Sequence, residues 1–352
     1  MRPQSTSLAL ILLLLVGGCA GAGTQPLPGQ PSHHVAGGFR NPWPDYRRPG
    51  TWTRWSFLAA HGFRLLAGPR AFVAPHESAE GLAAGRELWQ GNPTASVTWV
   101  GHATVLVHLD GVNVLTDPHW SERASPVSWA GPRRLSPPGV PFESLPPVHV
   151  VVISHDHYDH LDLATVKRLA ATHDPLFLVP LGFRRWFADI GISRVEEMDW
   201  WQEREVGGVR IVCTPAQHWS QRSPMDLNRR LWASWAVVGP SGRKVYFSGD
   251  TGYFEGFREI GRRLGPFDVA ALAIGAYLPR ALMRAHHLDP GEAVQAFLDV
   301  RAGVLLAIHW GTFDMSDEPL DEPPRRLRAE LARRDLPADR GWVLGMGETR
   351  GW

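Results

Sequence analysis

Short apolar runs separated by polar loops fill the chain from Ser96 onwards. Such runs, rich in Val, Ile and Leu and bounded by Gly, Pro, Asp or Asn, are typical of β-strands. They predict strands over residues 96–100, 104–109, 112–116, 148–153, 176–179, 209–214, 234–238, 244–248, 269–274, 303–308 and 342–344. The turn sequences Asp110-Gly111 and Gly239-Pro240-Ser241-Gly242 join two pairs of these strands and indicate hairpins.

Helical segments alternate with the strands. Asp162 is a suitable N-cap for a helix over 163–171, and Asp289, followed by Pro290 and an acid at the third position, begins another. Helices are also predicted over 182–190 and 324–334. Because several strands are hairpin-linked, the pattern predicts an α/β protein with mixed sheets and helices outside, and argues against a doubly wound parallel sheet. We assign this domain to residues 96–352.

The first residues have the pattern of a secretory targeting segment. Arg2 supplies a positive charge, and the apolar run 8–16 is shorter than the roughly 20 residues that span a bilayer. The run ends in VGGC, which resembles the lipobox of bacterial lipoproteins, in which the cysteine, here Cys19, is lipidated. Ala20 follows in place of Asp, which in such lipoproteins implies the outer membrane. We expect a cell-envelope lipoprotein facing the periplasm; an ordinary secretory signal is the alternative.

Three segments therefore precede the predicted domain. Residues 1–18 are expected to be the lipoprotein signal peptide. Residues 19–50 are rich in Gly, Pro, Gln and Ser and are expected to form a flexible tether. Residues 51–95 contain helical patterns and several aromatic side chains, and we expect a helical segment there.

Composition narrows the class of protein. Hydrophobic residues make up 44% of the chain and charged residues 20%, as in a globular protein, and a net charge of +1 gives no electrostatic case for binding nucleic acid. Cys213 is the only cysteine besides Cys19, lies in an apolar run and is expected to be a small buried side chain. With Cys19 acylated, no intramolecular disulfide can form. Composition leaves the oligomeric state open.

Ligand-type side chains gather directly after one buried strand, where residues 154–162 read SHDHYDHLD. In an extended segment, residues two apart point to the same side, so His155 and His157 can bind one cation together. Asp159 and His160 follow as the chain turns and could bind a second cation. Imidazole and carboxylate are the nitrogen and oxygen ligands that zinc prefers. The alternative is a solvated surface turn.

Three further candidates each follow a predicted strand: His218 in TPAQHW, Asp250 in FSGDTG and His309 in AIHWGT. Each alone has a simpler interpretation, because histidines at strand ends are commonly hydrogen-bonded surface residues and Asp is a frequent turn former. Four such segments at the ends of strands, in this order, favour a two-metal centre.

The order HxHxDH, His, Asp, His resembles that of the metallo-β-lactamase superfamily. The local sequences TWVGHATVLV, LTDPHWSERASPVSWAGPRRL, ISHDHYDHLD, QHW, GDTGYF, GPFDVAALAIGAY, HLDPGEA and AIHWGTF resemble the phospholipases D that hydrolyse N-acylphosphatidylethanolamine and their bacterial homologues. The resemblance covers roughly residues 96–310. It implies an αββα sandwich, in which two mixed sheets pack face to face with helices outside.

The resemblance also implies roles for individual residues. One zinc ion would be held by His155, His157 and His218, a second by Asp159, His160 and His309, and Asp250 would bridge them. His287 matches a histidine near the substrate phosphate, although the neighbouring His286 leaves open which of the two makes that contact. Asp117 and His102 would support the ligands. The ligand types alone also suit iron or manganese, so the choice of zinc follows from the resemblance.

The resemblance implies a zinc-dependent phosphodiesterase of the phospholipase D type with a phospholipid substrate. Two zinc ions roughly 3.5–4 Å apart can share a hydroxide that attacks phosphorus. Asp159 would orient that nucleophile, and His287 would steady the phosphate or protonate the leaving oxygen. Two alternatives remain at this stage: hydrolysis of another ester, such as a phosphorylated lactone or a cyclic phosphodiester, and a non-enzymatic envelope lipoprotein with a structural metal.

Overall fold

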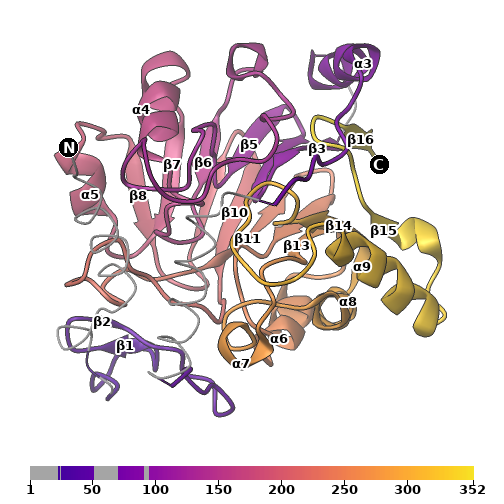
Figure 1. Cartoon of the computed structure of the whole chain (residues 1–352). Helices are drawn as coiled ribbons and strands as arrows, with labels where there is room; N and C mark the ends of the chain where they lie inside the picture. The colour runs from indigo at the N-terminus through magenta and orange to yellow at the C-terminus, as the bar shows by residue number, and fades with distance from the viewer. Residues whose placement is uncertain (1–22, 24, 51–69, 91–94) are drawn as a thin grey trace, which may run out of the picture.

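Two seven-stranded sheets form the centre of the molecule (Figure 1). The computed structural model describes residues 23, 25–50, 70–90 and 95–352. The first sheet has the order β16 (Thr349–Gly351), β3 (Ala95–Gly101), β4 (Thr104–Leu109), β5 (Val112–Thr116), β6 (Val150–Val152), β7 (Leu176–Pro180) and β8 (Val195–Met198). The second has the order β15 (Gly341–Trp342), β14 (Ala302–Ile308), β13 (Phe267–Ala273), β12 (Lys244–Phe247), β11 (Ser234–Val238), β10 (Val209–Thr214) and β9 (Glu203–Val206).

Both sheets are mixed. Strands β5 to β8 run parallel in the first sheet and β12 to β15 run parallel in the second, while the remaining neighbours are antiparallel. At the β4–β5 turn, Asp110 and Gly111 have φ values of 49° and 83°. Two successive positive φ values suit the turn geometry that matches the twist of a hairpin. The hairpins expected from the sequence are therefore present.

Helices cover the outer face of each sheet, so the molecule has four layers. They are α3 (Ala79–Gln90), α4 (Leu163–Thr172), α5 (Arg184–Asp189), α6 (Gly256–Arg263), α8 (Pro290–Asp299) and α9 (Glu322–Arg333). The short helix α7 (Arg280–Met283) buries no residue, and short 3₁₀ turns lie at Phe142–Ser144 and Ala338–Arg340. Figure 1 shows α4 and α5 beside the first sheet and α6, α8 and α9 beside the second. The predicted αββα fold is confirmed.

Successive side chains of one strand point to opposite faces of the sheet and pack in different apolar clusters. In β4, Val105 and Val107 join the core between the sheets, whereas Leu106 joins a second apolar cluster with Val166 and Leu169 of α4. Strands covered on both faces need apolar residues at nearly every position. This is why the sequence shows continuous apolar runs there.

The helix starts follow the expected capping chemistry. The Asp162 side chain accepts a hydrogen bond from the Ala164 amide, and Asp289 forms a reciprocal capping box with Glu292 ahead of α8. Strands β8, β9 and β16 were not predicted. They are short, and β9 reads Glu-Arg-Glu-Val with three exposed residues, so it carries no apolar signal.

Residues 25–50, which we call the arm, are packed against the domain, which departs from the flexible tether expected over 19–50. Strands β1 (His34–Val35) and β2 (Gly38–Phe39) form a small hairpin, with Val35 and Phe39 buried. The Trp43 indole stacks on Trp200 with 5.9 Å between ring centroids. The composition suggested a tether, but a few apolar and polar side chains provide enough contacts to hold the arm in place.

Most of the residues that carry the other N-terminal predictions are not described by the structure. The signal peptide and Cys19 lie outside the described residues. Of the helical segment expected over 51–95, residues 79–90 form α3, while 51–69 and 91–94 lie outside the described residues. Within the described part of the chain, no helix combines the length and the apolar character that crossing a bilayer requires.

Candidate active site

The candidate ligands come from loops at the carboxyl ends of four strands. The loop 154–162 follows β6, His218 follows β10, Asp250 follows β12, and His309 directly follows β14. Because these strand ends meet at one edge of the two packed sheets, the structure brings all seven predicted ligands into one cluster. That they hold a metal stays a prediction, and the geometry below is what bears on it.

Three imidazoles form one side of the cluster. His155 Nε2 lies 2.8 Å from His157 Nδ1, and His218 Nε2 lies 3.2 Å from the same atom. Burial lowers the pKa of each of the three rings. They are therefore neutral near pH 7, which is the form that binds a cation through nitrogen.

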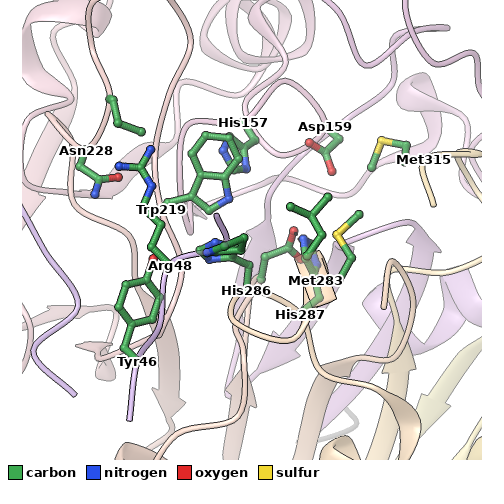
Figure 2. A pocket seen from close by; sticks show the side chains of 14 residues that line it. Tyr46, Arg48, His157, Asp159, Trp219, Asn228, Met283, His286, His287 and Met315 are labelled. Atoms are coloured by element: carbon green, nitrogen blue, oxygen red, sulfur yellow. Dashed lines mark ion pairs between the residues drawn. The ribbon is translucent and has the colours of Figure 1, made fainter. Parts of the chain in front are cut away.

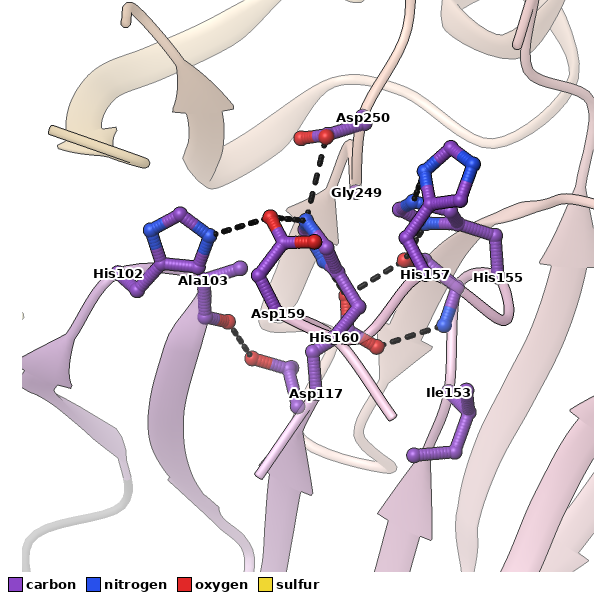
Figure 3. Close-up of polar contacts among 12 residues, drawn as sticks. His102, Ala103, Asp117, Ile153, His155, His157, Asp159, His160, Gly249 and Asp250 are labelled. Atoms are coloured by element: carbon purple, nitrogen blue, oxygen red, sulfur yellow. Dashed lines mark hydrogen bonds and ion pairs between the residues drawn. The ribbon is translucent and has the colours of Figure 1, made fainter. Parts of the chain in front are cut away.

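A second group faces this trio. His160 Nε2 lies 3.2 Å from Asp159 Oδ2, and His309 Nε2 lies 3.6 Å from the same oxygen. Asp250 lies against both rings. Its Oδ2 is 3.1 Å from His160 Nε2 (Figure 3). Its Oδ1 is 3.1 Å from His309 Nε2. One carboxylate oxygen of Asp250 also lies within 4.8 Å of a ring nitrogen of His218, which belongs to the first trio. Asp250 is thus placed to reach both sets, as a bridging carboxylate must.

Several of these buried atoms have no hydrogen bond despite their close neighbours. His160 Nε2, His309 Nε2 and Asp250 Oδ1 are all without a partner of acceptable geometry. Leaving a buried polar atom unsatisfied is costly, so such atoms are rare unless something else binds them. Imidazole nitrogens and carboxylate oxygens that converge in this way fit a bound divalent cation.

The pKa values of Asp250 and His309 are set by burial and by the charges of their neighbours. Burial alone would raise the pKa of Asp250, but the neighbouring His160 and His309 outweigh it and hold the pKa well below its usual range. Burial lowers the pKa of His309, yet Asp250 and Asp159 outweigh it and raise the pKa to about 9. A proton on His309 would therefore be replaced by the cation on binding.

Asp117 and His102 lie beside the ligands, as the sequence led us to expect. His160 Nδ1 is 2.7 Å from Asp117 Oδ2, and the Ser154 amide donates to Asp117 Oδ1 at 2.6 Å. His102 Nε2 is 2.9 Å from Asp159 Oδ2. Asp117, His102 and His309 all have φ between 34° and 62°, a strained region for these residues that is frequent at functional sites.

Asp156 is a supporting residue that the sequence reasoning missed. Its side chain is fully buried, accepts from the Gln221 amide at 2.8 Å and pairs with Arg230 at 2.8 Å. The alternation that turns His155 and His157 to one side turns Asp156 to the other, so the signal was present in the sequence. Asp156 ties the loop after β6 to the loop that follows His218.

A cavity of about 180 Å³ opens beside the cluster (Figure 2). It is lined by the ligand candidates His157, Asp159 and Asp250, by His286 and His287, by the largely apolar Trp219, Leu227, Leu282, Met283 and Met315, by Asn228, and by Tyr46, Arg48 and Pro49 of the arm. The arm residues of this wall were not predicted, because the sequence offered no reason to bring residues 46–49 next to the loop after β6.

His286 and His287 both line the cavity but face different neighbours. His287 Nδ1 lies 3.7 Å from Asp250 Oδ2, and burial lowers the pKa of His287 to about 4. The His286 carbonyl accepts from His218 Nδ1 at 2.9 Å, and its ring lies 5.9 Å from that of Tyr46. His287 is therefore nearer to the ligand carboxylate, while His286 orients a ligand and faces the arm.

Comparisons with known proteins show which family this chain is similar to. Residues 112–310 match the beta-lactamase superfamily domain family. The chain is 46% identical over 264 residues to the N-acyl-phosphatidylethanolamine-hydrolyzing phospholipase D 1 of Caenorhabditis elegans. This alignment covers 71% of this chain and 74% of the nematode protein. The chain is 32% identical over 258 residues to the mitochondrial enzyme of the same name from Saccharomyces cerevisiae, covering 72% and 55%.

Among solved structures, Igni18, a metallo hydrolase from the archaeon Ignicoccus hospitalis, has a TM-score of 0.57 at 21% identity, covering 73% of this chain and 98% of that one. That likeness bears on the fold alone. The matched family region spans more than half of the chain, and the nematode relative is 46% identical across 74% of its own length. The chain therefore belongs to the metallo-β-lactamase superfamily.

Proposed function

We propose that this chain is a zinc-dependent phosphodiesterase that hydrolyses N-acylphosphatidylethanolamine or a closely related phospholipid. Its membership of a family of metal-dependent hydrolases gives the broader class, and the nematode and yeast relatives carry this activity in their names. The observation that carries the proposal is the ligand cluster, whose buried atoms without hydrogen bonds lie directly beside a largely apolar cavity.

Two cation sites follow from the grouping of side chains. His155, His157 and His218 would hold one ion, and Asp159, His160 and His309 would hold the other, with Asp250 contacting both. The clusters also contain His102, which lies within reach of Asp159 and His309. We assign His102 to support, because its hydrogen bond to Asp159 leaves that carboxylate oriented toward the cations.

The bound cations would activate water near neutral pH and stabilise negative charge on the phosphoryl oxygens. Within the chain, Asp159 lines the cavity and can accept a hydrogen bond from the attacking water. Neutral His287 can donate its N–H to a phosphoryl oxygen, and its low pKa favours this role over full protonation of the leaving group. As the water oxygen bonds to phosphorus, the phosphorus–oxygen bond to the ethanolamine side would break. The departing oxygen would take up a proton that the water loses, which releases phosphatidic acid and an N-acylethanolamine.

The outer wall of the cavity suits a lipid. Trp219, Leu282, Met283 and Met315 present apolar side chains beside the cation sites, and they exclude water from one side of the reacting group. A cavity of about 180 Å³ holds a headgroup region, so the acyl chains would extend beyond it. Lipid anchoring through Cys19 at the outer membrane remains part of the proposal and would keep the enzyme beside its substrate.

The proposal is tested with a panel of defined phospholipids whose products are identified by mass spectrometry. The wild-type protein should release N-acylethanolamine and phosphatidic acid, and chelation should stop the release. Asp159→Asn should lower turnover by about 100-fold or more. Turnover of a phosphorylated lactone or a cyclic phosphodiester without turnover of any phospholipid would replace the proposed substrate with another ester.

A further inference from the structure

The arm brings three side chains into the wall of the active-site cavity. Tyr46, Arg48 and Pro49 line the same cavity as His157 and Asp250. Figure 2 shows Tyr46 and Arg48 in the wall of this cavity with His157. The match to the superfamily domain covers residues 112–310, so these arm residues lie outside that match. None of the three belongs to the candidate metal-binding groups among the described residues.

The arm is held against the site at several points. The Asn41 side chain donates from Nδ2 to the carbonyl of His218 at 2.8 Å, and the Phe39 amide donates to the carbonyl of Asn228 at 2.8 Å. His33 and His34 lie 2.7 and 2.8 Å from the two carboxylate oxygens of Asp199. These contacts fix the path of residues 33–41, which lead directly into the lining residues.

Arg48 differs from its neighbour in what its guanidinium contacts. Arg47 donates to the carbonyl oxygens of Pro44 and Tyr46 at 2.6 and 3.0 Å. Arg48, among the residues that the structure describes, makes neither a hydrogen bond nor an ion pair, and it lines the cavity. A guanidinium carries a permanent positive charge and five N–H donors, so Arg48 presents charge and donors to whatever enters.

We propose that Arg48 is a specificity-determining residue that selects N-acylated over unacylated ethanolamine headgroups. The inference rests on the proposed function. An unacylated ethanolamine headgroup carries a cationic ammonium, which Arg48 would repel. N-acylation converts the ammonium into a neutral amide, whose carbonyl oxygen can accept a hydrogen bond from the guanidinium. One residue thus disfavours the wrong headgroup and favours the right one.

The test uses the full-length protein loaded with zinc and the variant Arg48→Gln. Arg47→Gln is the matched control, because it makes the same change of charge one residue away, outside the cavity wall. The substrates are N-oleoyl phosphatidylethanolamine and unacylated phosphatidylethanolamine in identical mixed micelles, and bis(4-nitrophenyl) phosphate, a diester with neither an ammonium nor an amide.

Loss of one charge-assisted hydrogen bond should lower kcat/KM for the N-acylated lipid by about tenfold in Arg48→Gln. The kcat/KM for bis(4-nitrophenyl) phosphate should stay within about twofold, and Arg47→Gln should behave as the wild type does. The charge reversal Arg48→Glu should lower the preference for the N-acylated over the unacylated lipid further than Arg48→Gln does.

Two results in Arg48→Gln would overturn the inference alone: an unchanged ratio of kcat/KM for the N-acylated over the unacylated lipid, or a parallel loss of kcat/KM on the N-acylated lipid and on bis(4-nitrophenyl) phosphate. A parallel loss would mean that Arg48 acts through the structure of the arm. If the wild-type protein hydrolyses bis(4-nitrophenyl) phosphate but not the N-acylated lipid, the proposed function fails, and the inference fails with it.

Discussion

Two of the histidine–carboxylate clusters in the described part of the chain differ in how their polar atoms are satisfied. In the first, which we call the clasp, His33 Nε2 and His34 Nε2 each lie within 2.8 Å of a separate oxygen of Asp199. In the second, the ligand cluster, His160 Nε2, His309 Nε2 and Asp250 Oδ1 are buried at 3.1 Å contacts that are not hydrogen bonds.

This difference separates a structural contact from a candidate metal site. The clasp matches each imidazole to one carboxylate oxygen and needs no further partner, so hydrogen bonding accounts for it. The ligand cluster brings five imidazoles and two carboxylates together and leaves several of their converging atoms, among them His160 Nε2, His309 Nε2 and Asp250 Oδ1, without a hydrogen bond. Both clusters have the composition of a zinc site. They are distinguished by whether their converging nitrogen and oxygen atoms have hydrogen-bond partners.

The same substitution in the two clusters should have very different effects. Asp250→Asn should lower kcat by more than about 100-fold and reduce the bound metal, because even partners outside the ligand set cost 10–100-fold. Asp199→Asn should leave metal content unchanged and turnover within a few-fold. Steady-state kinetics and elemental analysis measure both. Equal losses in the two variants would contradict the distinction.

Metal removal should destabilise the ligand cluster and spare the clasp. At a free zinc concentration of about 1,000 times the dissociation constant, binding contributes about 4 kcal/mol to the free energy of unfolding. Chelation should therefore lower the melting temperature by several degrees in the wild type and in Asp199→Asn alike. A melting temperature that chelation does not change, measured by calorimetry, would argue against bound metal.

Zinc affinity should weaken as the pH falls. The pKa of His309 in the metal-free protein is about 9, so below that value zinc must displace a proton from its ring. Each displaced proton lowers the apparent affinity by about tenfold per pH unit. Titration calorimetry in buffers of different ionisation enthalpy should show proton release near pH 7, equally in Asp199→Asn. Binding without proton release would contradict this assignment.

The smallest effect is expected from weakening the clasp itself. Asp199→Ala removes both acceptors and leaves the buried His33 without a partner, which should cost about 1–3 kcal/mol of stability. The loss should be local to the arm, so hydrogen exchange should accelerate over residues 25–50 more than in β6 or β14. Uniform acceleration across the molecule would show that the clasp stabilises the whole domain and does not act on the arm alone.

The sequence predicted the parts of this molecule that depend on local pattern. Continuous apolar runs marked the strands, because strands covered on both faces bury nearly every residue. The ligands were recognisable because each follows such a run, as with His309 after β14. The edge strand β9 was missed because its residues are polar and exposed.

The arm was missed for a different physical reason. Its position depends on a few long-range contacts, such as Asn41 with the His218 carbonyl and Trp43 with Trp200, between residues more than 150 positions apart. A segment rich in Gly and Pro carries no periodic signal for such contacts. The cavity wall formed by Tyr46 and Arg48 was therefore inaccessible to sequence reasoning, although the ligand cluster beside it was not.

Elemental analysis of the purified full-length protein, combined with its hydrolysis of N-acylphosphatidylethanolamine, tests the central claim most directly. The account predicts about two zinc ions per chain, and activity that disappears on chelation and returns when zinc is restored. A protein that contains no metal, or that turns over the lipid at its full rate after complete metal removal, would contradict the account.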